Sequence, residues 1–380
     1  MSSCILYQNP SATVTLLDIP RSIELAQGFS SNLASARLLS SKPLEYPYPS
    51  VEPRSVKARA NLSNFSLEEL LLQKHLEFVL HELKGGHEGL WCLPRVTVEE
   101  GNGSSDGTIE RKRQRLDLAD AERVPAESSL EDASLKADHV VLLDDCLHFH
   151  NSKQKPLNLA FSPSKSKVTI PPRSTFLLGD IAPTLPIFTL SAPKFSLIIL
   201  DPPWPNRSAR RKQSYSISYG PSEIRFLLSS IPLYNHLVDK GLVAVWVTNK
   251  PTLREMLLGE GGLFEEWGVQ LVEEWIWLKV TSKGEPICAL DSVWRKPFEV
   301  LLLGRRGGER VGGMKRRVIL GVPDLHSRKP NLKILFEHIM GRKEGEYDAL
   351  EIFARNLTAG WWSWGNEVLK FQSPEHWAEP

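Results

Sequence analysis

A short apolar run, Leu197–Leu200, is followed at once by an acid, two prolines and a tryptophan. A run of Ile and Leu bounded by proline is typical of a strand buried on both faces, as in an α/β sheet. The strand is expected to end there because proline has no N–H to donate to a sheet. Open α/β sheets bind ligands at the carboxyl ends of their strands, so the residues after Leu200 are predicted to form an active site.

Those four residues, Asp201, Pro202, Pro203 and Trp204, have the groups needed to hold a planar base by its exocyclic amine. The Asp201 carboxylate can accept one hydrogen bond from the amine, and a carbonyl of the stiff Pro-Pro turn can accept another. Trp204 offers a ring for stacking, worth roughly 1–3 kcal/mol per base. The amine nitrogen would then face a methyl donor in line, and positioning can supply much of the rate. The alternative is a structural turn with a packed tryptophan.

Further motifs follow in a fixed order: Trp246–Asn249, Lys296–Glu299, His326–Pro330, Glu351–Asn356 and Trp364–Val368. Together with the segment 200–220 they resemble the eukaryotic MT-A type of adenine-N6 methyltransferases. The ending of the motif series is most similar to the branch called methyltransferase-like protein four. The resemblance covers roughly residues 170–372 and says little about residues 1–135.

This resemblance implies a Rossmann-like α/β fold, S-adenosylmethionine as the methyl donor, and a permuted (beta-class) order of motifs. The cofactor strand, Asp348–Phe353, is then reached late in the chain. The resemblance places Asp180 and Ile181 beside the cofactor's adenine, and Lys329 at the carboxylate of its methionine end. It places Arg355, Asn366 and Glu367 near the cofactor's ribose. The cofactor-binding residues expected are Asp180, Ile181, Asp201, Pro203, Lys329, Arg355, Asn366 and Glu367. No Gly-rich loop follows the cofactor strand, so that independent signal for the cofactor is absent.

A polar and basic segment, residues 205–219, comes directly after Trp204. Its arginines can neutralise phosphates and its tyrosines can stack on bases, so we expect a substrate clamp rather than a merely solvated loop. A second buried strand, Gly241–Val247, ends near a candidate amide. The substrate-binding residues expected are Asn206, Arg207, Arg210, Tyr215, Tyr219 and Asn249.

The whole chain has 380 residues and a net charge of +1, so a nucleic-acid site must be a local patch. Its four cysteines lie far apart without a CxxC pair, which argues against zinc and disulfides. His148 and His150 form an HxH pair, but no further ligands follow at a usual spacing, and we expect no metal. No apolar run approaches the ~18–20 residues of a membrane span.

Composition divides the chain into five parts. We predict an N-terminal mixed α/β extension (1–98), a flexible linker (99–137), a connecting segment (138–170), the catalytic domain (171–372) and a tail (373–380).

A capping box, Ser66 with Glu69, predicts a packing helix over 66–84 that Gly85-Gly86 ends. Further helices are predicted over 221–237, 251–258 and 331–340, and strands over 14–17, 139–143, 175–178, 271–280 and 298–303.

The reaction predicted is N6 methylation of adenine in RNA, because an unpaired adenine can be splayed out and stacked. The branch resemblance implies 2′-O-methyladenosine in a small nuclear RNA, and also adenine in DNA, where base flipping costs a few kcal/mol. The alternatives are a catalytically inactive RNA-binding scaffold, and methylation of a protein glutamine or of cytosine. The Gly- and Arg-rich stretch 304–317 is short and polar, which favours a monomeric enzyme.

A basic cluster, Arg111–Arg115, lies in the predicted linker and is typical of a nuclear localisation signal. We therefore expect the protein in the nucleus, with the cytoplasm as the other compartment. Residues 105–120 fused to a fluorescent reporter should accumulate in nuclei, as scored by microscopy against a fusion whose four basic residues are alanine. A reporter that stays cytoplasmic would contradict the assignment.

Overall fold

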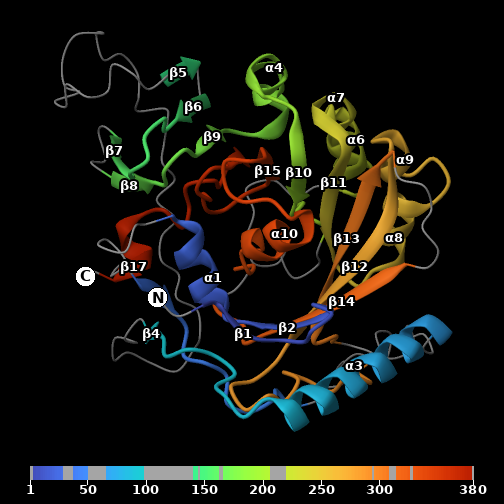
Figure 1. The fold of residues 1–380 in the computed structure, drawn as a ribbon. Helices are drawn as coiled ribbons and strands as arrows, with labels where there is room; N and C mark the ends of the chain where they lie inside the picture. The colour runs from blue at the N-terminus through green and yellow to red at the C-terminus, as the bar shows by residue number, and fades with distance from the viewer. Residues whose placement is uncertain are drawn as a thin grey trace.

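The structure is a computed structural model that describes residues 3–28, 37–49, 66–97, 140–143, 146–161, 166–205, 220–292, 295–307, 314–325 and 328–378. Within these ranges one large mixed sheet forms the centre of the molecule (Figure 1). Its strands are β1 (Ile5–Gln8), β2 (Val14–Leu17), β5 (Val140–Leu143), β6 (Cys146–His150), β9 (Thr175–Leu178), β10 (Phe195–Leu200), β11 (Leu237–Val247), β12 (Val269–Lys279), β13 (Phe298–Arg306), β14 (Lys315–Gly321), β15 (Ala349–Ile352) and β16 (Trp362–Gly365). Their order is β1-β2-β14-β12-β13-β11-β10-β15-β16-β9-β6-β5.

The interior of this sheet is a parallel group made by β11, β10, β15, β16 and β9. Leu197 of β10 pairs with Leu242 on one side and with Ala349 on the other. These strands are apolar along most of their length, as expected where both faces are covered. The predicted α/β class and the strand before Asp201 are confirmed, while the permuted order of motifs stays a prediction.

Helices cover both faces of the sheet (Figure 1). One face carries α4 (Ile181–Ser191), α6 (Pro221–Ser230), α7 (Leu233–His236), α8 (Pro251–Leu258) and α9 (Leu263–Glu266). The other face carries α1 (Ile19–Ala26) and α10 (Lys333–Met340). In the described ranges no helix combines the length and the apolar character needed to cross a membrane.

The N-terminal strands belong to the main sheet. Leu16 of β2 pairs with Leu320 of β14. Below them lies α3 (Leu67–Gly86), whose Ser66 and Glu69 make both bonds of the predicted capping box. The helix buries Leu76 and Leu80 against the ends of β12, β13 and β14. The proposed division at residue 98 therefore crosses a shared core, and a separate N-terminal domain stays a prediction that this core does not support.

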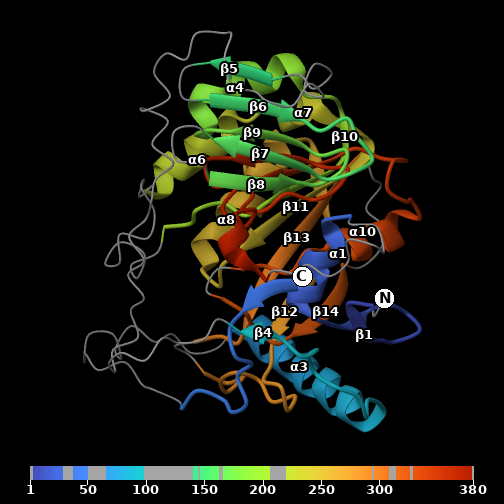
Figure 2. The same ribbon diagram turned by 90° about the vertical axis from the view of Figure 1, so that its left-hand side faces the viewer.

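Smaller sheets complete the fold. β7 (Leu157–Phe161) and β8 (Ser166–Ile170) form an antiparallel pair near β6 and β9 (Figure 2). β3 (Arg37–Ser40) pairs with β4 (Val96–Thr97) and with β17 (Trp377–Ala378), which follows the 3₁₀ turn Pro374–His376. The end of the chain is thus joined by backbone pairing to its N-terminal segment.

Several boundaries differ from the sequence prediction. The helix expected over 221–237 is two helices, because Pro232 has no N–H for the helix and interrupts it. The helix α3 runs through Gly85 and Gly86 instead of ending before them, and α10 begins at Lys333. The helix α4 was not expected, since Pro183 and Pro186 argue against helix in this sequence.

The basic stretch 304–317 also differs from expectation where it is described. Arg305 and Arg306 continue β13, and Lys315 begins β14. Arg316 pairs with Glu274 at 2.9 Å and Arg317 with Glu273 at 2.7 Å. These two arginines are therefore engaged within the sheet.

We predict that the N-terminal strands unfold together with the catalytic strands. Leu16→Ala should lower the free energy of unfolding by about 2–5 kcal/mol, because it leaves a cavity at a side chain that is 0% exposed. Leu71→Ala, at a side chain 59% exposed, should change it by less than about 0.5 kcal/mol. Urea unfolding followed by tryptophan fluorescence measures both. A separate early transition in the Leu16 variant would show that the N-terminal strands are an independent unit.

Candidate active site

The carboxyl ends of four parallel strands meet at one edge of the sheet. Asp180 follows β9, Asp201 follows β10, Phe353 follows β15 and Asn366 follows β16. The Asn366 amide donates to the Asp180 carboxylate at 2.6 Å, and the Asp201 N–H donates to the carbonyl of Ile352 at 3.3 Å. Four segments that are distant in sequence therefore present polar groups to one place, as the strand pattern predicted for Asp201.

A half-buried chain of charges runs through this edge. The Lys329 ammonium donates to Glu299 at 2.6 Å and lies 3.3 Å from the Asp201 carboxylate. Glu299 also pairs with Lys279, at the end of β12. Lys329 lies over the ring of Trp246, 5.0 Å from its centre. Two cations and two carboxylates thus alternate in the order Lys279, Glu299, Lys329 and Asp201.

The charges in this chain set the protonation of its members. Burial alone would raise the pKa of Glu299, but the charges of Lys329 and Lys279, with their hydrogen bonds, outweigh it and lower the pKa to about 2. Burial would lower the pKa of Lys329, but the charges of Asp201 and Glu299 raise it above its usual value. Glu299 is an anion and Lys329 a cation throughout the physiological range.

A further acid, Glu351, lies on the same face of the sheet as Asp201. It pairs in register with Ile199 on β10, two positions before Asp201, so both carboxyl groups leave their strands on one side. Burial, and next the charge of Asp201, raise the pKa of Glu351 to about 8. Since the two cations are already paired with other acids, Glu351 holds its proton at neutral pH.

The turn after β10 is tight and anchored. The Trp204 N–H donates to the carbonyl of Pro202 at 2.8 Å. The Trp204 indole N–H donates to the carbonyl of Trp246 at 2.7 Å, and the side chain is only 8% exposed. The backbone of Pro205 accepts a hydrogen bond from Lys250. The ring orientation is therefore set by β11, and base stacking on Trp204 stays a prediction that must use its small exposed part.

The ends of β9 and β16 both require glycine. Gly179 and Gly365 have φ values of +149° and +148°, and a Cβ on Gly179 would lie 2.6 Å from Thr184 Cγ2. Side chains other than glycine would therefore distort these strand ends. Beside them, Arg355 pairs with Glu367 at 3.0 Å. Carboxylates, an amide and a cation here suit a ligand with a diol, an amine and a carboxylate, so the residues fit the cofactor that the sequence predicted.

The other predicted residues are distributed as follows. Asn249 lies two residues after the end of β11, and its amide donates to the carbonyl of Phe298 at 2.9 Å. Ile181 is 4% exposed at the start of α4. Pro203 lies in the turn between Asp201 and Trp204. The remaining predicted clamp residues lie outside the described part of the chain: Asn206, Arg207, Arg210, Tyr215 and Tyr219.

Sequence reasoning did not identify Lys279, Glu299 or Glu351 as site residues. Glu299 entered the sequence analysis only within the motif Lys296–Glu299, and Lys296 lies 4.0 Å from Glu69 of α3. A charged residue in an otherwise apolar strand was the available signal, because buried charges require partners. The identity of those partners depends on the strand order.

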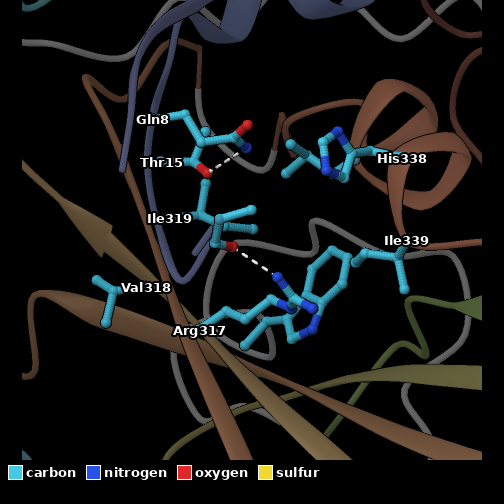
Figure 3. A pocket seen from close by; sticks show the side chains of 10 residues that line it. Gln8, Thr15, Arg317, Val318, Ile319, His338 and Ile339 are labelled. Carbon is cyan, nitrogen blue, oxygen red and sulfur yellow. Dashed lines mark hydrogen bonds between the residues drawn. The ribbon is translucent and has the colours of Figure 1, made fainter. Parts of the chain in front are cut away.

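A small pocket lies away from the strand ends, between β2, β14 and α10 (Figure 3). Gln8 bonds Thr15 at 3.1 Å on one wall. On the other wall Arg317 donates to the carbonyl of Ala12 at 2.6 Å (Figure 3). Its polar groups are satisfied within the fold, and we assign it no catalytic role.

The histidine pair is built into the sheet. His150 shares a hydrogen bond of 2.8 Å with the hydroxyl of Thr175. The ring of His148 lies 5.4 Å from that of Trp362. In the described ranges no three His, Cys, Asp or Glu side chains are grouped as metal ligands.

Comparison with known proteins gives a consistent result. Residues 195–367 match the family model described as MT-A70. The chain is 39% identical to the N6-methyladenosine RNA methyltransferase MTA1 of Cryphonectria parasitica, over 99% of this chain and 94% of that protein. It is 31% identical to the N(6)-adenine-specific methyltransferase METTL4 of Mus musculus, over 82% of this chain and 66% of that protein. It is 34% identical to the DNA N6-methyl methyltransferase of Caenorhabditis elegans, over 56% and 55%.

We predict that Glu351 makes stability depend on pH. Between its usual pKa of 4.5 and the folded value of about 8, the folded chain holds a proton that the unfolded chain has released. Stability is therefore present below pH 4.5 and is lost as the pH rises through 8. Glu351→Gln removes this dependence. Its melting temperature at pH 8 should therefore exceed that of the wild type by roughly 2–4 °C for each kcal/mol of unfolding free energy that the wild type loses.

The measurement is differential scanning calorimetry at pH 5 and pH 8, with Glu255→Gln, an exposed acid on α8, as the control. The control should follow the wild type at both pH values. If the melting temperature of Glu351→Gln changes between pH 5 and pH 8 by as much as that of the wild type, the assignment of the proton to Glu351 is refuted.

Proposed function

We propose that RNA is the substrate of this chain. The chain belongs to the MT-A70 family and is an adenine-N6 methyltransferase that uses S-adenosylmethionine. The finer proposal is that the acceptor is 2′-O-methyladenosine in a small nuclear RNA. DNA adenine is the second candidate, favoured by the relative from Caenorhabditis elegans whose name states DNA methylation.

The observation that carries the chemistry is the placement of Asp201. It lies at a strand end beside the Pro-Pro turn, with its carboxylate against the Lys329 ammonium at 3.3 Å. In this position it can accept a hydrogen bond from the N6 amine of adenine. The ion pair with the lysine holds the carboxylate in position, and the tight turn limits its motion. The proton released after methylation passes to water or to Asp201.

The cofactor supplies the methyl group. In this proposal Lys329 binds its carboxylate, and Asp180 and Asn366, which bond to each other after β9 and β16, contact its adenine. Glu367 presents a carboxylate for the ribose diol. The roles of these residues are part of the proposal and rest on their convergence at one edge of the sheet.

Support for RNA comes from the extent of similarity. The fungal relative named as an RNA methyltransferase matches along 99% of this chain, including the N-terminal segment that shares the main core. The relative named as a DNA methyltransferase matches 56% of it. A substrate that contacts the N-terminal segment would explain why similarity extends beyond the catalytic motifs.

We predict that the purified chain transfers label from radiolabelled S-adenosylmethionine to N6 of an RNA oligonucleotide. Matched oligonucleotides carry adenosine or 2′-O-methyladenosine at one site, and a DNA version is the third acceptor. RNA with 2′-O-methyladenosine should give the highest kcat/KM. Asp201→Ala should lower the rate by about 10²-fold or more, the scale of losing one positioned polar group.

Folding and cofactor binding serve as controls for this variant. In Asp201→Ala, Lys329 keeps its partner Glu299, so no buried cation is left alone and the fold should be retained. Calorimetric titration with S-adenosylmethionine should detect binding in both proteins. Higher kcat/KM on DNA than on both RNAs would contradict the RNA proposal, and equal rates on the two RNAs would contradict the 2′-O-methyl proposal.

A further inference from the structure

Two exposed tyrosines lie beside each other in the segment 42–49. Tyr46 is 66% exposed and Tyr48 is 49% exposed, values that are unusual for large rings. The ammonium of Lys283 lies 3.9 Å from the ring centre of Tyr46, and the guanidinium of Arg295 lies 6.0 Å from that of Tyr48. We call these four side chains the tyrosine platform.

The platform is attached to the edge of the sheet that carries Asp201. The Tyr48 N–H donates to the carbonyl of Ile287 at 2.8 Å, and Ile287 in turn donates to the carbonyl of Lys279 at 3.1 Å. Lys279 is the last residue of β12 and pairs with Glu299 in the active site. Backbone hydrogen bonds therefore connect the platform directly to the charge chain around Asp201.

The distance between platform and active site follows from the strand order. Two backbone steps lead from Tyr48 to β12, and three strand spacings lead from β12 through β13 and β11 to β10. At about 4.8 Å for each step, the separation is about 24 Å or less in a twisted sheet. This span reaches nucleotides that flank a target base, and not the target itself.

The backbone of the segment is stiff. Each tyrosine is followed by a proline, Pro47 and Pro49, and a residue before proline is restricted to extended conformations. The two rings are thus presented with little freedom to lose on binding, which lowers the entropy cost of stacking.

The charges around the rings are mostly positive. Lys42 is 82% exposed, and Lys283 and Arg295 lie on the rings. Glu45 lies 4.0 Å from both lysines and offsets one of them. Three cations against one carboxylate can contact phosphates while the rings remain available for bases.

We propose that the tyrosine platform binds unpaired nucleotides flanking the methylated adenosine in RNA. This inference rests on the proposed function and extends it to a second contact surface, built by the N-terminal segment and the loop after β12. The bases stack on Tyr46 and Tyr48, and the neighbouring cations contact the phosphates. Substrates that are too short to span both places do not use it.

The test compares a long acceptor with a short one. The long acceptor is an RNA of about 20 nucleotides, more than the roughly 4–16 that a stacking surface covers. The short acceptor is a trinucleotide with the same central adenosine. In the double variant Tyr46→Ala, Tyr48→Ala, KM for the long RNA should rise about tenfold or more, with kcat and S-adenosylmethionine affinity unchanged. The kcat/KM for the trinucleotide should equal that of the wild type.

Two further variants control for structure and chemistry. Tyr234→Ala removes another exposed tyrosine, 52% exposed with Arg306 4.2 Å above its ring, at the opposite edge of the sheet. Its KM for the long RNA should match that of the wild type. Tyr46→Phe, Tyr48→Phe keeps both stacking faces and should retain the wild-type KM.

The outcomes separate this inference from the proposed function. If the wild type methylates the long RNA and the double alanine variant shows the same KM, the platform proposal is overturned. If the double alanine variant instead loses binding to a protein partner while its KM for the long RNA stays the same, the platform proposal is overturned as well. If the wild type labels no RNA, the proposed function fails, and fluorescence anisotropy of the unmethylated long RNA still decides whether the tyrosines bind it.

Discussion

The Lys329 ammonium, held between Asp201 and Glu299, is the interaction on which the geometry of the active site depends. A buried charge is stable only when it is paired, and removal of one partner leaves the other uncompensated. The pairing therefore requires the end of β10, the start of β13 and the segment before α10 to meet. Lys279 extends the same requirement to β12. Charged residues from four segments are placed together by the need to neutralise each other's charges.

The segment that carries Lys329 is itself held by the N-terminal part of the chain. Arg328, next to Lys329, pairs with Asp324 and donates to the carbonyl of Leu39 at 2.9 Å. Asp324 also accepts the backbone N–H of Ser41 at 2.8 Å. Leu39 and Ser41 lie outside residues 195–367, which match the family model, whereas Asp324 and Arg328 lie inside them. The N-terminal segment therefore holds the segment that carries Lys329 in place. The tyrosines of the same N-terminal segment lie at the same edge of the sheet. We therefore propose that this segment contributes to function directly as well as structurally.

Local sequence was sufficient to predict the strand before Asp201 and the helix capped by Ser66. Each of these follows from a pattern over a few residues. The break at Pro232 was also visible in principle, because proline cannot continue a helix, but it was outweighed by the apolar period on both sides. The helix α4 is the opposite case. Its two prolines argue against helix, and burial of Phe188 against Trp364 outweighs that preference.

The order of residue types along the chain was enough to specify an α/β sheet and the strand end that carries Asp201, because strand periodicity and proline act over neighbouring residues. The tertiary structure alone decided that Glu299 neutralises Lys329, that Glu351 keeps a proton, and that tyrosines from residues 42–49 lie at the catalytic edge. Those results depend on which strands pair. Strand pairing joins segments up to hundreds of residues apart, and the free energy that selects it comes from burying charge and apolar surface together, which no local pattern contains.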